Sequence, residues 1–237
     1  MGSFVYVPSS KFTEIVGLCG YDFVVIDMEH GPVDFVVAEE MIRAAEIAGT
    51  TPLLRVAHNT PHLLLRALDI GAQGLHIPDV NSADDARRAV TSSRYGPEGE
   101  RGLAGVRAAD YGLEQPLSEY CREANKQVMV IAHIESLQAV EALDSLLEVD
   151  GIDVYYLGPQ DLSNSMGIPG QSGDERVRKL VDESIERIAQ AGRTAGCIAT
   201  DADTARRYID LGARYIASHA VRHMADASRR FIKVVLE

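Results

Sequence analysis

The stretch PLLRVAHNTPHLLLRALDIGAQGLHIP, residues 52–78, contains the repeating unit from which we infer the fold. A short apolar run at Pro52–Val56 is followed by a segment of helical period at Pro61–Ile70 and by a second apolar run at Gly74–Pro78. Gly71 follows the helical segment, and glycine readily adopts the left-handed conformation that ends a helix. The stretch therefore predicts a strand, a helix and a second strand, the order found in parallel β/α proteins.

The same alternation extends along the whole chain. The apolar runs that we expect to form strands are Phe4–Pro8, Phe23–Asp27, Pro52–Val56, Gly74–Pro78, Val128–Glu135, Val154–Gly158, Ala195–Ala199 and Tyr215–Ser218. The segments of helical period are Lys11–Leu18, Phe35–Ala48, Pro61–Ile70, Ser82–Thr91, Pro116–Ala124, Leu137–Leu147, Glu175–Ala191, Ala202–Leu211 and Val221–Val235. Near-continuous apolar strands are typical of a parallel sheet covered by helices.

Eight consecutive strand–helix units without a linker predict an α/β fold, a single (β/α)8 TIM barrel that occupies residues 1–237 as one domain. An open, doubly wound sheet is the alternative. Such sheets usually carry a glycine-rich turn after the first strand, whereas Val7-Pro8-Ser9-Ser10 contains no glycine.

Composition narrows the range of partners. With 35 Asp and Glu against 23 Lys and Arg, the chain has a formal charge of −12 at pH 7, which disfavours nucleic acid and anionic membranes. No apolar run approaches the roughly 20 residues of a membrane helix. Cys19, Cys121 and Cys197 are odd in number and widely spaced, which indicates reduced thiols. We therefore expect a cytoplasmic metabolic protein.

Ionisable residues gather where the expected strands end. Active sites of TIM barrels lie at the carboxyl ends of the strands. Those ends carry Asp27, Glu29, His30, Arg55, His133, Glu135, Asp161, Ser218 and His219, and His76 lies within the fourth strand. Burial of so many ionisable groups is costly unless they are paired, hydrogen-bonded or bound to a cation.

Glu135 and Asp161 follow neighbouring strands and have no cationic neighbour in the sequence. Two converging carboxylates with open coordination positions suit a hard cation, so we expect Mg²⁺ or Mn²⁺ at this site. Each carboxylate alone could instead cap the helix that follows it.

The segment Asp27-Met28-Glu29-His30 brings a carboxylate and an imidazole close together. We expect Asp27 to orient the ring of His30 and to raise its basicity; a histidine with a structural role at a turn is the alternative. Arg55 lies in an apolar run and needs an anionic partner, either a developing oxyanion or a structural ion pair with Asp27 or Glu29. No lysine lies at the carboxyl end of an expected strand, which disfavours a Schiff-base mechanism.

The segment Ser93–Gln115 is the one long stretch without an assigned element. A loop of this length in a compact domain is usually functional or mobile. Its residues Arg94, Arg101 and Arg107 could meet a distal carboxylate of a substrate, although arginines on a loop are more often solvated.

Six strings of the sequence are specific when taken together: IDMEHGP (26–32), PLLRV (52–56), LDIGAQGLHIP (68–78), RYGPEGERG (94–102), IES (134–136) and LGPQDLS (157–163). They resemble the HpcH/HpaI family of metal-dependent (class II) pyruvate aldolases, in order along essentially the whole chain. The resemblance implies a TIM barrel that cleaves 4-hydroxy-2-oxo acids to pyruvate and an aldehyde. It also implies that Glu135 and Asp161 bind the divalent metal, with Mg²⁺, Mn²⁺ or Co²⁺ as candidates.

The resemblance further implies roles for the other site residues. Arg55 would stabilise the enolate oxygen, and His30, oriented by Asp27, would serve the proton transfers. The backbone N–H groups of Gln160 and Asp161 would hold the pyruvate carboxylate.

The resemblance also implies a homo-oligomer. Family members form hexamers, as trimers of dimers that exchange the C-terminal helix, here about Val221–Leu236, and Asp69 would reach the active site of a neighbouring subunit. His133 stands where the family commonly has glutamine. It could therefore hydrogen-bond metal-bound water or substrate as glutamine would, or ligate the metal directly.

Three other functions are compatible with the same residues. The site could decarboxylate oxaloacetate, or it could couple decarboxylation to carbon–carbon bond formation as in macrophomate synthase. A barrel that binds a small acid without turnover is a more distant alternative.

Overall fold

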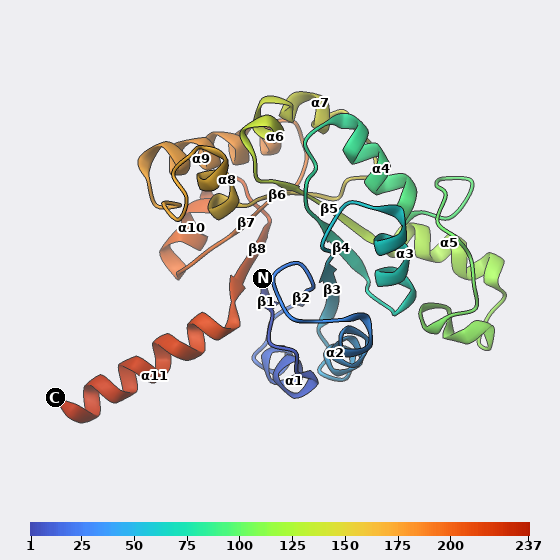
Figure 1. Cartoon of the computed structure of the whole chain (residues 1–237), viewed down its shortest axis with the longest axis horizontal. Helices are drawn as coiled ribbons and strands as arrows, with labels where there is room; N and C mark the ends of the chain where they lie inside the picture. The colour runs from blue at the N-terminus through green and yellow to red at the C-terminus, as the bar shows by residue number, and fades with distance from the viewer.

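The computed structural model describes residues 1–237 and contains a closed barrel of eight parallel strands in sequence order (Figure 1). The strands are β1 (Gly2–Val5), β2 (Phe23–Asp27), β3 (Thr51–Arg55), β4 (Gly74–Ile77), β5 (Met129–Ile134), β6 (Val154–Leu157), β7 (Ala195–Ile198) and β8 (Tyr215–His219). Pairing of β1 with both β2 and β8 closes the barrel. The predicted TIM barrel is confirmed.

Helices surround the strands. They are α1 (Ser10–Leu18), α2 (Phe35–Ile47), α3 (Pro61–Asp69), α4 (Ala83–Ser93), the 3₁₀ helix η1 (Arg107–Gly112), α5 (Leu117–Gln127), α6 (Leu137–Glu141), α7 (Leu143–Leu147), α8 (Pro159–Ser165), α9 (Glu175–Gln190), α10 (Ala202–Asp210) and α11 (Ala220–Leu236). The side chains of Ser9, Asp34, Ser82 and Asp201 cap helices by accepting from a backbone N–H three residues later. None of the helices combines the length and apolar character needed to cross a membrane.

Two predicted elements differ clearly from the structure, and the short elements η1 and α8 lie where no helix was predicted. The first strand was expected at Phe4–Pro8 but lies at Gly2–Val5, because Pro8 has no N–H to donate and Ser9 already caps α1. The helix expected over Leu137–Leu147 is divided into α6 and α7 at Ala142.

Alternation along the strands separates two apolar cores. Phe23, Val25 and Leu53 belong to a cluster of nine buried residues inside the barrel, whereas Val24 and Leu54 belong to the larger cluster between the strands and the helices. Because side chains alternate from face to face along a strand, every second residue points into the barrel. This parity decides which polar residues enter the site.

The segment between α4 and α5 packs at the amino end of the barrel. Arg101 donates to Asp69 at the end of α3 (2.9 Å), and Arg107 donates to the carbonyl of Ile70 (3.0 Å). Arg94 pairs with Asp153, which directly precedes β6 (3.6 Å). These arginines therefore lie away from the carboxyl ends of the strands and do not line the cavity there. Arg94 and Arg101 are also buried, so the interpretation of solvated loop arginines does not hold for them.

Helix α11 extends away from the barrel (Figure 1). None of its 17 residues is buried, and its exposed apolar side chains include Met224, Phe231, Ile232, Val235 and Leu236.

Candidate active site

Strand register brings three polar residues together inside the barrel. Asp27 on β2 pairs in register with Arg55 on β3, and Arg55 pairs with His76 on β4. Phe23 and Val25 point into the barrel, and side chains alternate along a strand, so Asp27 also points inward. Arg55 and His76 lie in register with Asp27 and therefore point inward as well. Each of them is buried.

Arg55 is held by two carboxylates. Its Nε and Nη2 donate to the two oxygens of Asp27 at 2.9 and 2.5 Å, and its Nη1 lies 3.0 Å from Glu29 Oε2. Burial raises the pKa of Asp27, but the hydrogen bonds and charge of Arg55 outweigh burial and hold this pKa below its ordinary value. The structural ion pair that the sequence left as an alternative is thus present. The guanidinium also lies 5.0 Å from the centre of the Phe4 ring.

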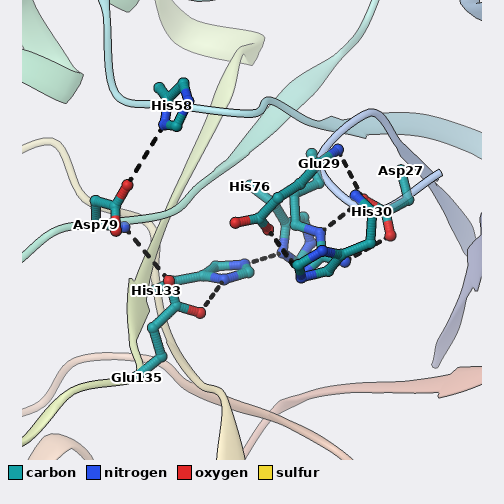
Figure 2. Close-up of polar contacts among 9 residues, drawn as sticks. Asp27, Glu29, His30, His58, His76, Asp79, His133 and Glu135 are labelled. Atoms are coloured by element: carbon teal, nitrogen blue, oxygen red, sulfur yellow. Dashed lines mark hydrogen bonds and ion pairs between the residues drawn. The ribbon is translucent and has the colours of Figure 1, made fainter. Parts of the chain in front are cut away.

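The expected pair between the Asp27 carboxylate and the His30 imidazole is not formed. Asp27 Oδ1 accepts from the backbone N–H groups of Glu29 and His30, at 3.0 and 3.3 Å, and its remaining capacity is used by Arg55. The ring of His30 is 62% exposed, with Nε2 3.9 Å from Glu29 Oε2 (Figure 2). Asp27 therefore shapes the backbone that carries His30 but does not contact its ring.

Glu135 and Asp161 line the same cavity and both lie close to Gly158, which follows β6. A methyl group built on Gly158 would lie 3.1 Å from Glu135 Oε2 and 3.9 Å from Asp161 Oδ2. The missing side chain of Gly158 thus leaves room beside both carboxylates. No group of three or more His, Cys, Asp and Glu side chains is arranged to hold a metal.

The pKa values of the two carboxylates shift in opposite directions. Burial raises the pKa of Glu135, but the charge and hydrogen bond of His133 outweigh it, and the net shift is downward. Burial raises the pKa of Asp161, and the neighbouring charge of Glu135 raises it further. Repulsion between two carboxylates is relieved by a cation placed between them, so this donor set fits a hard divalent metal.

Glu135 is fixed from both sides. Its Oε1 accepts from the backbone N–H of Asp79 at 3.3 Å, and its Oε2 lies 3.0 Å from His133 Nδ1 (Figure 2). Asp79 adopts a left-handed conformation with φ of 58°, which is uncommon outside glycine but tolerated by aspartate. The strained turn after β4 thus aims an N–H group at the carboxylate.

A buried hydrogen-bonded chain continues from Glu135 into the barrel. His133 Nε2 lies 2.9 Å from His76 Nδ1, and His76 Nε2 lies 2.8 Å from the hydroxyl of Tyr215. An ionised carboxylate can only accept, so His133 must carry a proton on Nδ1. When both rings are neutral, His76 therefore also carries its proton on Nδ1, and Tyr215 donates to its Nε2. Both nitrogens of His133 are engaged, so direct ligation of a metal would break one of these bonds.

A cavity of about 200 Å³ opens above these residues. Its lining includes Phe4, His30, Arg55, His133, Glu135, Tyr156, Gly158, Gln160, Asp161 and His219. The hydroxyl of Tyr156 and Nδ1 of His219 are buried without a partner in the chain, as expected of groups that meet a ligand or water. A larger cavity, about 560 Å³, lies at the other end between α2, α3 and α5, where no strand end contributes a catalytic group.

The structure thus brings most of the predicted site residues together. Gln160 and Asp161 lie in the first turn of α8, where backbone N–H groups have no acceptor within the helix. Asp69 lies outside the cavity of its own subunit. Sequence reasoning missed Asp79 and Tyr215, and nothing in the sequence around either residue distinguishes it from an ordinary loop or strand residue.

The buried histidine His76 makes stability depend on pH. Burial, with the nearby His133 and Arg55, lowers the pKa of His76 well below 6.5. Below about pH 6.5, His76 is protonated in the unfolded chain but stays neutral in the folded one. The free energy of unfolding therefore declines as pH falls, by up to about 1.4 kcal/mol per pH unit for one proton. We expect urea unfolding of His76→Gln to show a shallower decline between pH 7 and pH 5 than the parent protein. Equal slopes would assign the decline to other groups.

Comparison with known proteins gives a consistent result. Residues 1–223 match the family model described as HpcH/HpaI aldolase/citrate lyase. A 2-keto-3-deoxy-L-rhamnonate aldolase from Klebsiella pneumoniae is 38% identical over 219 residues, which cover 92% of this chain and 81% of the relative. A 4-hydroxy-2-oxovalerate aldolase from Novosphingobium aromaticivorans is 38% identical over 221 residues, which cover 92% of this chain and 82% of the relative.

Solved structures agree. An HpcH/HpaI aldolase/citrate lyase family protein from Burkholderia cenocepacia J2315 superposes with a TM-score of 0.94 at 34% identity, covering 100% of this chain and 94% of that one. The residues quoted from the sequence, the barrel and these similarities all agree: the chain belongs to the HpcH/HpaI aldolase/citrate lyase family.

Proposed function

We propose that the protein is a metal-dependent, class II pyruvate aldolase that reversibly cleaves a 4-hydroxy-2-oxo acid to pyruvate and an aldehyde. The observation that carries the proposal is the placement of Glu135 and Asp161 beside Gly158, in a cavity that Arg55 also lines. The aldolases among the relatives support the reaction class.

Glu135 and Asp161 would hold the metal. Carboxylate oxygens favour Mg²⁺ or Mn²⁺, and Co²⁺ is a further candidate. When bound, the cation would supply positive charge beside the keto oxygen of the substrate, where negative charge develops as the C3–C4 bond breaks.

The residues of the chain would bind and orient the substrate around that charge. The Arg55 guanidinium, already fixed by Asp27 and Glu29, would donate to the developing enolate oxygen without reorganisation. The backbone N–H groups of Gln160 and Asp161 would donate hydrogen bonds to the pyruvate carboxylate. His30, on the cavity wall and accessible to water, would serve the proton transfers: it would take the proton from the C4 hydroxyl, which releases the aldehyde, and a proton returned to C3 of the enolate would complete pyruvate. His133 would act by holding Glu135.

We further propose a homo-oligomer, a hexamer built as a trimer of dimers, in which α11 is exchanged between subunits and Asp69 reaches a neighbouring site. The exposed apolar side chains of α11, which no part of its own barrel covers, support the exchange. We place the protein in the cytoplasm, which the three free cysteines support.

The experiment that tests the aldolase proposal is proton exchange of pyruvate in D₂O, followed by ¹H NMR. With Mg²⁺ or Mn²⁺ present, we expect the methyl signal to decay, and we expect chelation to stop the decay. Cleavage assays with 4-hydroxy-2-oxovalerate and with oxaloacetate then separate an aldolase from a decarboxylase. Thermal stabilisation by pyruvate without any exchange would identify a barrel that binds a small acid without turnover.

A further inference from the structure

A second cavity adjoins the candidate active site. It has a volume of about 360 Å³, and four residues line both cavities: Pro159, Gln160, Ile198 and His219. Its remaining lining comes from the segments that follow β6, β7 and β8. A molecule whose reacting end lies between Glu135 and Arg55 can therefore extend past His219 into this second cavity.

The second cavity is basic. Arg178 of α9, Arg207 of α10 and Arg222 of α11 line it, and its lining contains no aspartate or glutamate. Arg207 pairs with Asp182, whereas Arg178 and Arg222 have no carboxylate within 4.0 Å. In a chain of net charge −12, three helices thus bring arginines together at one place beside the site. We call this second cavity, with its three arginines, the basic pocket.

The pocket also contains hydroxyl groups, in addition to the side chains of Gln160 and His219. Ser172, Thr200 and Thr204 line it together with the arginines. Asp201 caps α10 and accepts from the hydroxyls of Thr200 and Thr204, so its charge is partly satisfied within the turn. Because Thr200 and Thr204 donate their hydroxyl protons to Asp201, the donors left for a ligand are the two unpaired guanidinium groups and the hydroxyl of Ser172. These donors suit an anion with several oxygen acceptors.

We propose that the basic pocket binds a terminal anionic group, a carboxylate or a phosphate, on the aldehyde part of the substrate. The inference rests on the proposed aldolase function and adds the class of aldehyde. In many TIM barrels the loops after the seventh and eighth strands bind phosphate, and the basic pocket occupies this position. The reacting carbonyl then lies in the site cavity and the charged tail lies at Arg178 and Arg222, which are the residues that select the aldehyde.

The test compares matched aldehydes in aldol addition to pyruvate. Glyceraldehyde 3-phosphate is compared with glyceraldehyde, and succinic semialdehyde with butanal, so that each pair differs in its charged terminus. We expect kcat/KM to be about tenfold or more higher for the anionic member of at least one pair. A preference confined to the phosphate pair identifies a phosphate site, and one confined to the other pair identifies a carboxylate site.

Variants then assign the preference to residues. We expect the double variant Arg178→Gln/Arg222→Gln to lose about tenfold or more of kcat/KM for the preferred anionic aldehyde and to change the neutral one less than about twofold. The matched control Arg122→Gln/Arg206→Gln removes two exposed charges that lie outside both the pocket and α11, and it should leave the values for both aldehydes unchanged.

Two outcomes overturn the inference: equal rates for both members of each pair, or equal losses for anionic and neutral aldehydes in the double variant. Pyruvate exchange in D₂O separates this failure from failure of the aldolase function, because exchange needs no aldehyde. Exchange without anionic preference refutes the basic pocket alone, whereas absence of exchange refutes the aldolase function.

Discussion

Replacing Glu135 with glutamine, or Asp161 with asparagine, is expected to abolish metal binding and to lower the rate of aldol cleavage by roughly a thousandfold or more. The loss follows from the loss of several kcal/mol of charge stabilisation, since about 1.4 kcal/mol corresponds to a factor of ten. Glutamine fits Glu135's position poorly for a second reason. Asp79 N–H and His133 Nδ1 each donate to one carboxylate oxygen, so the amide NH₂ would face a donor on one side.

Binding of Mn²⁺, followed by electron paramagnetic resonance, measures the first effect without reference to turnover. The control is Glu141→Gln, which removes the same charge at an exposed position of α6 and should leave Mn²⁺ affinity and rate unchanged. Thermal unfolding confirms that each variant is folded. Undiminished Mn²⁺ binding by both Glu135→Gln and Asp161→Asn would refute the metal site.

Replacing Arg55 with methionine is expected to lower both stability and rate. Two buried or half-buried carboxylates, Asp27 and Glu29, would lose their cation, and breaking a buried pair costs about 3–5 kcal/mol. Because the enolate charge exists late in the reaction, we expect kcat to fall by roughly 10²–10³ with little change in KM. Urea unfolding and steady-state kinetics measure the two effects separately.

The double variant Arg55→Met/Asp27→Asn distinguishes the two roles of Arg55. Neutralising Asp27 removes most of the uncompensated charge, so stability should return in part while kcat stays low. Arg43→Met is the matched control, because Arg43 pairs with Glu39 on the surface, where such pairs contribute about 1 kcal/mol or less. A change in KM alone would contradict the proposed contact with the enolate oxygen.

The barrel could be predicted from the sequence because each β/α unit carries its own local signals. Apolar runs at Phe23–Asp27 and Val154–Gly158 correspond to β2 and to β6 within one residue. Alternation then places inward residues by counting, which is why Asp27 and Arg55 could be identified as members of the site. The spacing of apolar residues and the alternation of side chains along a strand are both properties of short segments. Both can therefore be recognised in a single sequence.

Partners within the site could not be predicted in the same way. The carboxylate of Asp27 is three residues from His30 but binds Arg55, 28 residues away, because parallel register sets the two side by side. The conformation of Asp79 and the contact of Tyr215 with His76 likewise depend on elements that are distant in sequence. The segment Ser93–Gln115 shows neither helical nor strand periodicity, so its location at the amino end of the barrel could not be predicted and is known only from the structure.

The series of contacts from Glu135 through His133 and His76 to Tyr215 links the site cavity to the amino end of the barrel. Tyr215 is the first residue of β8 and stacks on Phe23, far from any substrate. The Glu135 carboxylate fixes the tautomers of His133 and His76, and Tyr215 is the donor at the far end of the same series of hydrogen bonds. A substitution at Tyr215, at the amino end of the barrel, would therefore alter the hydrogen bonds that position Glu135 while every residue that lines the site cavity stays the same.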